Sequence, residues 1–232
     1  IQIQRGLGSS KLAISSVGGT VNIVTKATEL DQGGFVQTLV GNDRYQKTSV
    51  GYNTGLLENG WGASLMFTHW EGNGYNKGTA GWGQNYFFSL GYKANEKHQF
   101  NFMIFGAPQQ HQQNFSNTIG KYLEHGRKYN SNHGLLNGKI YNERTNYYHK
   151  PVANLNWDFT INESTSLATV LYASWGRGGG TGGWGSSSNK VYTSDGLVNY
   201  DAIKQNNEAI VGGVGTFGNG AYATRSSVNN HQ

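Results

Sequence analysis

The sequence predicts an all-β protein whose strands belong to a barrel in a membrane. Glycine contributes 35 of the 232 residues and proline only 2, which disfavours long helices, while 13% aromatic residues are too many for a disordered chain. Segments in which apolar and polar residues alternate recur along the chain, as in half-buried strands. The connections between these segments are alternately short and long. Together these observations indicate about seven antiparallel strands.

Each strand is predicted from its alternation and from the turn residues beside it. Two short helices are expected, one at 117–124, where apolar residues have helical spacing, and one near 201–209. Residues 177–232 show no convincing pair of strands. The expected strands are residues 34–40, 45–56, 61–70, 84–92, 99–107, 151–160 and 166–176.

The lengths of the connections favour a membrane barrel over a soluble sandwich. Those after the second, fourth and sixth strands have about four or five residues, whereas those after the third, fifth and seventh grow from about a dozen to about 40 and then beyond 50. A sandwich has no reason to keep every second connection short, but a membrane barrel has short turns on one rim and long loops on the other. Segments 108–149 and 177–232 are therefore expected to be extracellular loops in a bacterial outer membrane.

Alternation within the strands agrees with this geometry. In the sixth strand, Leu155, Trp157 and Phe159 share one face, and Asn154, Asn156 and Asp158 share the other. An apolar face toward lipid and a polar face toward the lumen fits a barrel, although a half-buried soluble sheet alternates in the same way. The aromatic residues expected to form girdles at the membrane interfaces are Trp61, Trp70, Tyr92, Trp157 and Trp175.

Such a barrel is expected to be incomplete in this chain. Bacterial single-chain barrels have an even number of strands, and an open edge in lipid leaves backbone groups unpaired. The chain is therefore expected to continue beyond Gln232 or to have its edges covered. Pro108 ends the fifth strand and Pro151 begins the sixth, where a missing amide donor is tolerated.

Several function classes are disfavoured. The net charge of +5 comes from scattered Lys and Arg residues that form no basic stripe, so nucleic acid is not an expected partner. No cysteine is present, which excludes disulfides and thiolate metal sites. No nucleophile elbow or zinc-protease motif occurs, so no catalytic residues, no metal, no cofactor and no enzymatic activity are predicted.

The first 26 residues carry a family resemblance. The segment IQIQRGLGSSKLAISSVGGTVNIVTK has a strand, Arg-Gly, Val-Gly-Gly and an apolar strand ending in Thr-Lys. This order resembles the end of the plug domain of TonB-dependent outer-membrane transporters. Gln2 and Leu7 depart from the family pattern, which usually has an acidic residue and often a proline there. The matching signature positions are Arg5, Gly6, Val17, Gly18, Gly19, Asn22, Thr25 and Lys26.

The resemblance implies a domain organisation and a function. Residues 1–30 would be the C-terminal part of a plug domain, and residues 31–232 the N-terminal part of a barrel that has 22 strands in this family. The implied function is active uptake of a scarce nutrient, such as a siderophore or metal chelate, driven by the inner-membrane TonB complex. The sequence is closer to the ferric-chelate and general nutrient branch, and its composition is similar to that of Bacteroidetes proteins.

Three alternatives stay open. A glycan-importing branch of the same family works with a surface lipoprotein, a passive porin would have no plug, and a surface protein could use this barrel to bind a protein partner without transport. The expected partners are therefore outer-membrane lipid, the TonB complex, a small nutrient ligand, and a surface lipoprotein or other protein.

Two motifs are interpreted without assigning a function to them. Residues 178–183 match G-x-G-x-x-G, but no helical pattern follows, so a dinucleotide site is rejected in favour of a flexible or closely packed loop base. His111, His125, His133 and His149 lie in or beside the 108–149 segment without metal-ligand spacing, and solvated loop histidines are the simpler interpretation.

Ligand-binding candidates come from the two long segments, together with the plug stretch 6–16. Tyrosine, arginine and tryptophan provide stacking surfaces and adaptable hydrogen bonds, although any long ordered loop contains them. The candidates are Tyr122, Arg127, Tyr129, Arg144, Tyr147, Arg177 and Trp184.

Overall fold

A computed structural model describes residues 2–5, 19–22, 25–210 and 221–231. At the N-terminus, β1 (Gln2–Arg5) and β2 (Gly19–Asn22) form an antiparallel pair in which Arg5 lies opposite Gly19. A 3-10 turn, η1 (Ala27–Glu29), then leads into the main sheet. Of the predicted plug signature, Gly6, Val17 and Gly18 lie outside the described residues, as does the stretch 6–16.

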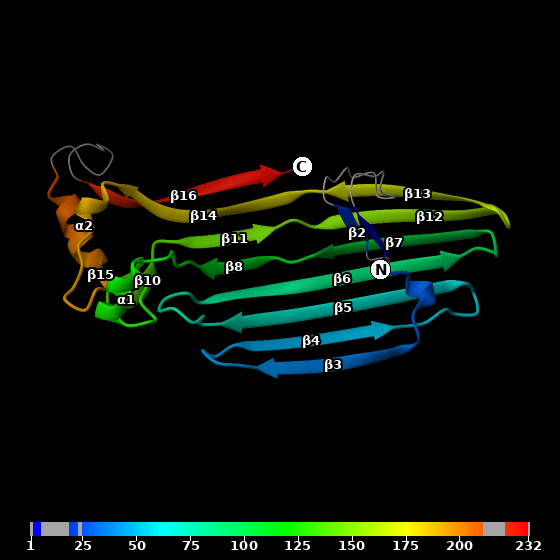
Figure 1. Cartoon of the computed structure of the whole chain (residues 1–232), viewed down its shortest axis with the longest axis horizontal. Helices are drawn as coiled ribbons and strands as arrows, with labels where there is room; N and C mark the ends of the chain where they lie inside the picture. The colour runs from blue at the N-terminus through cyan, green and yellow to red at the C-terminus, as the bar shows by residue number, and fades with distance from the viewer. Residues whose placement is uncertain (1, 6–18, 23–24, 211–220, 232) are drawn as a thin grey trace.

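The main sheet contains all the predicted strands, in the predicted order (Figure 1). Each strand pairs antiparallel with the next one in the list that follows. No helix in the described part of the chain is long and apolar enough to cross a membrane. The strands are β3 (Gly33–Val40), β4 (Gln46–Asn53), β5 (Trp61–Gly72), β6 (Gly81–Lys93), β7 (His98–Gly106), β12 (Val152–Asn162) and β13 (Thr165–Ser174).

Three of these strands continue beyond their predicted ends. In Figure 1, β8 (Gln109–Gln112) follows the line of β7, β11 (Thr145–His149) that of β12, and β14 (Gly176–Gly185) that of β13. The register does not shift across the gaps. Phe105 lies opposite Val152 and Gln112 lies opposite Thr145, and the segments 105–112 and 145–152 have the same number of residues. Pro108 and Pro151 therefore interrupt strands that resume beyond them, since proline removes only its own donor.

The prediction that 177–232 lacks a strand pair is wrong. β14 pairs antiparallel with β16 (Tyr222–His231) along the full length of both strands. The glycines of β14 hid the alternation because they carry no side chains. Instead, side chains of β11 and of the residue before it cover them: a Cβ on Gly178 would lie 2.6 Å from the ring of Tyr148, and one on Gly182 would lie 2.8 Å from Arg144. The sequence 178–183 is thus a strand, with no helix at its end to bind a dinucleotide.

The strand pairing assigns every side chain of the sheet to one of two faces. The polar face contains Ser49, Ser64, Thr68, Ser89 and Asn101, all at most 6% exposed, although Phe35 and Phe105 also lie on it. The apolar face contains Val50, Leu65, Phe88, Leu155 and Leu171, which are 38–64% exposed. Burying hydroxyls and amides while exposing large apolar side chains is the reverse of the pattern in a water-soluble protein.

Aromatic residues form a row across the apolar face near the short turns. Trp61 lies opposite Tyr92 with ring centroids 4.5 Å apart, Tyr92 lies opposite Phe100, and Phe100 lies opposite Trp157. Trp70 differs from the expected girdle residues. It lies opposite Lys47 and Gly83, which places it on the polar face.

A small lobe covers the end of the sheet with the long connections, opposite the β12–β13 turn (Figure 1). Both predicted helices belong to it: α1 (Ile119–His125) is capped by Thr118, and α2 (Tyr200–Glu208) is capped by Asn199. The remaining elements are β9 (His133–Leu136), β10 (Lys139–Asn142), η2 (Ser187–Asn189) and β15 (Val198–Asn199). Its core consists of Val198, Tyr200, Ile203 and Tyr222.

A buried ion pair joins the lobe to the sheet. Lys190 Nζ lies 2.5 Å from Glu143 Oε1, and the two side chains are only 8% and 1% exposed. The hydroxyl of Tyr222 donates to Glu143 Oε2 at 2.8 Å, and that of Tyr200 donates to the carbonyl of Asn132 at 2.6 Å. Burial, with the Glu143 carboxylate nearby, raises the pKa of both tyrosines. This network orders two segments that the sequence treats as loops.

Candidate ligand-facing surface

The segment that follows β2 docks on the polar face near the short turns. Asn101 donates from Nδ2 to the carbonyl of Thr25 at 3.3 Å and accepts at Oδ1 from the amide of Ala27 at 3.4 Å. Gln99 donates to the Thr28 hydroxyl at 2.5 Å, and Lys26 Nζ lies 3.1 Å from Asp158 Oδ2. The chain therefore enters the sheet from its polar face, in contact with β7 and β12.

Beyond Pro108 and Pro151 the sheet projects as a separate region, here called the extension: β8, β11, β14, β16 and the paired ends of β4, β5 and β6. The continuous strand 145–162 spans about 55–60 Å at ~3.3 Å per residue. Tilted by ~40°, it rises about 45 Å, well beyond the ~30 Å of a hydrocarbon core. Both faces of the extension carry polar side chains together with aromatic ones, such as Gln110 and Trp82 on the apolar face and Asn146 and Trp70 on the polar face.

Aromatic rings and cations gather on the polar face of the extension. The Trp70 ring lies over Gly83, where a Cβ would be 2.7 Å from its Nε1, and Tyr45 stacks beside it at 6.5 Å between centroids. Tyr148 covers Gly178, as described above. The guanidinium of Arg225 lies 5.1 Å from the ring centroid of Trp184.

Arg144, immediately before β11, is the cation of this face with an unused hydrogen-bond donor. Its guanidinium lies 5.1 Å from the Phe115 ring centroid, and its Nε is buried without a hydrogen-bond partner. With Lys47 and Arg225, it gives this face three cations, and the described strand residues of the same face in the extension include no Asp or Glu. This surface therefore suits an anionic ligand with flat or aromatic parts.

The structure brings only some of the predicted ligand residues together. Arg144 and Trp184 lie on the polar face of the extension. Tyr147 and Arg177 lie on the apolar face, opposite Gln110 and His149 respectively. Trp70, Lys47 and Arg225 were not predicted as ligand residues. In the alternation of β5, Trp70 falls on the same side as Ser64 and Thr68, and this was the signal that could have identified it.

The other three predicted residues lie in or beside α1. The hydroxyl of Tyr122 accepts a hydrogen bond from the Asn117 amide at 3.3 Å, and Arg127 is exposed after the helix. Tyr129 is 6% exposed and packs against His125, and burial raises its pKa, all of which indicates a structural role.

The four histidines of this region lie apart. His149 is 2.9 Å from the Tyr86 hydroxyl on the apolar face, His111 lies in β8, and His125 packs on Tyr129. His133 is buried, and burial lowers its pKa. Among the described residues, no three His, Cys, Asp or Glu side chains are grouped so that they could hold a metal ion.

Comparison with known proteins agrees with this geometry. No family model matches the chain, and no curated protein matches it. The crystal structure of the ferric-catecholate import receptor Fiu from E. coli K12, in its closed form, matches 97% of this chain with a TM-score of 0.57 and 12% sequence identity. The fold is that of part of a TonB-dependent receptor barrel. The chain spans 30% of the length of that receptor, and the match gives no support for a Bacteroidetes origin.

Proposed function

We propose that this chain is part of the wall and plug of a TonB-dependent receptor in the bacterial outer membrane. On this proposal, residues 1–30 end the plug, residues 31–232 begin the barrel, and the lobe and the extension face the cell exterior. The observation that carries the proposal is the reversed burial of the sheet, in which Ser, Thr and Asn are buried on one face and Leu, Phe and Val are exposed on the other. A lipid surround makes such an exposed apolar face favourable.

The function that this architecture supports best is uptake of a scarce nutrient, such as a siderophore or another metal chelate. The polar face of the extension would meet the ligand before it reaches the plug. Its three cations suit an anionic chelate, and Trp70, Tyr148 and Trp184 offer rings for stacking. Energy supplied by the inner-membrane TonB complex would then drive release of the ligand through the lumen, past the Lys26–Asp158 contact.

Uptake assays on the full-length protein that contains this chain test the proposal. Cells lacking their own receptors would be supplied with labelled ferric chelates, with and without a functional TonB complex. We expect TonB-dependent uptake, and we expect Arg144→Ala to lower chelate affinity roughly 10- to 100-fold, because a charge-assisted contact contributes ~1.5–3 kcal/mol. Lys139→Ala removes an exposed cation of the lobe and is the matched control.

The alternatives are distinguishable outcomes of the same assay. Uptake of an oligosaccharide that requires a surface lipoprotein would indicate the glycan-importing branch instead. Correct insertion in the outer membrane without uptake of any nutrient, but with capture of a protein through the lobe, would indicate a surface assembly role. Uptake that persists without the TonB complex would contradict the proposal.

A further inference from the structure

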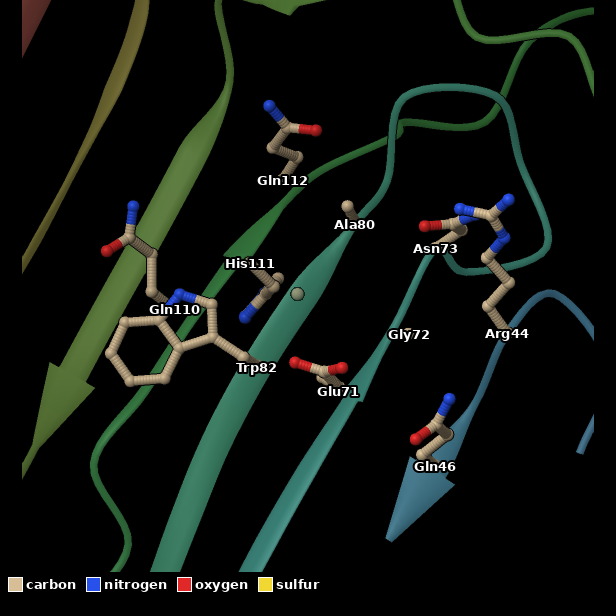
Figure 2. Close-up of a pocket in the computed structure, with 11 residues that line it drawn as sticks. Arg44, Gln46, Glu71, Gly72, Asn73, Ala80, Trp82, Gln110, His111 and Gln112 are labelled. Atoms are coloured by element: carbon tan, nitrogen blue, oxygen red, sulfur yellow. The ribbon is translucent and has the colours of Figure 1, made fainter. Parts of the chain in front are cut away.

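A groove lies on the apolar face of the extension, on the side of the sheet away from the candidate ligand surface (Figure 2). Its volume is about 680 Å³. Strand pairing places four of its side chains in one row across four strands: Gln46 opposite Glu71, Glu71 opposite Trp82, and Trp82 opposite Gln110. Arg44, Asn73, His111 and Gln112 also line it, with Gly72, Ala80 and Gly81.

The chemistry of the groove suits a saccharide. Trp82 is 44% exposed and offers a ring face on which a sugar can stack. The amide groups of Gln46, Gln110 and Gln112 each offer two donors and an acceptor, which match sugar hydroxyls. Figure 2 shows these side chains around the same open space as the Glu71 carboxylate and the Arg44 guanidinium.

The position of the groove along the strands determines which layer of the membrane it faces. One row nearer the short turns, the same face has His69 opposite Gln84 and His149 opposite Arg177. In the next row, Tyr86, whose hydroxyl contacts His149, begins the band of exposed apolar side chains. The groove therefore faces the surrounding membrane just outside the hydrocarbon core, at the level of the lipid headgroups.

Charge near the groove is complementary to an anionic headgroup. Arg44 lines the groove and Arg177 lies on the same face, and the lining carries one carboxylate, that of Glu71, which lies 3.5 Å from His69 Nε2. We propose that the groove binds the sugar headgroup of an anionic glycolipid in the outer leaflet. The inference rests on the proposed location in the outer membrane, and it gives Tyr147 and Arg177 a role at the lipid surface.

Lipid titrations on the purified full-length protein test the inference. Native mass spectrometry in detergent would compare binding of lipopolysaccharide, of phosphatidylglycerol, and of the acyl-free core oligosaccharide. We expect lipopolysaccharide to bind most tightly, and we expect Trp82→Ala or Arg44→Gln to weaken its binding at least about 10-fold. Tyr172→Ala removes an exposed aromatic residue from the polar face and should leave this binding unchanged.

Three results would overturn the inference. Binding of lipopolysaccharide that neither variant weakens would exclude the groove. Equal binding of phosphatidylglycerol would indicate attraction to charge alone, and equal binding of the free oligosaccharide would indicate a soluble saccharide instead. Failure of the proposed uptake function is separate, because a protein that inserts in the outer membrane but imports nothing would still bind the glycolipid here.

Discussion

Substitution of Leu155 by arginine tests which face of the sheet is in contact with lipid. Leu155 is 41% exposed at the centre of the apolar band and lies between Phe102 and Leu171 on its two neighbouring strands. If this face meets lipid, Leu155→Arg places a guanidinium near the bilayer midplane, at a cost of ~2–4 kcal/mol. Since ~1.4 kcal/mol is tenfold, the ratio of folded to unfolded protein should fall roughly 30- to 900-fold.

The next residue supplies the matched control. Asn156 lies opposite Asn101 on the polar face, so Asn156→Arg adds the same charge to the same strand without exposing it to hydrocarbon. The free energy of unfolding of the full-length receptor in lipid vesicles would be measured by urea titration, with the heat-dependent gel shift of folded barrels as a second readout. Equal losses for the two variants, or a larger loss for Asn156→Arg, would refute the assignment of the faces.

Three further predictions concern the polar network and the docked N-terminal segment. Glu143→Gln removes the carboxylate partner of the buried Lys190 ammonium and should lower the free energy of unfolding by about 3–5 kcal/mol, measured as faster limited proteolysis of the lobe. Adding Lys190→Met should restore resistance to the protease. Burial raises the pKa of Tyr222, so above about pH 10 the folded lobe keeps a proton that the unfolded chain loses. The free energy of unfolding of the lobe should therefore be constant below about pH 10 and fall at higher pH. The fall should be less steep in Tyr222→Phe. Asp158→Asn removes a partly exposed ion pair with Lys26 and should lower the unfolding free energy by less than about 1 kcal/mol in thermal denaturation; a larger loss would show that this contact does more than pair two charges.

Much of the sheet was predictable because its signals are local. Alternation in a strand such as β12 follows from the two-residue repeat of a β-strand, and the turn residues mark where the chain reverses. The starts of α1 and α2 are likewise local, because the side chains of Thr118 and Asn199 cap backbone amides of the first turn that follows.

The continuation of the strands beyond the prolines was not predictable in this way. Pro108 and Pro151 are strand breakers locally, and only pairing with neighbouring strands carries the backbone through them. The glycines of β14 have no side chains to alternate, and the partners that cover them, Tyr148 and Arg144, come from a different strand.

The sequence by itself determined the all-β class, the order of the strands, and which side chains share a face, because these follow from the backbone repeat and from neighbouring residues. Only the tertiary structure decided which face is buried, that Trp70 joins Arg144 and Trp184 on the polar face, and that Tyr147 and Arg177 lie on the other. Those outcomes depend on register between strands far apart in the sequence, and register is fixed by pairing across the whole sheet.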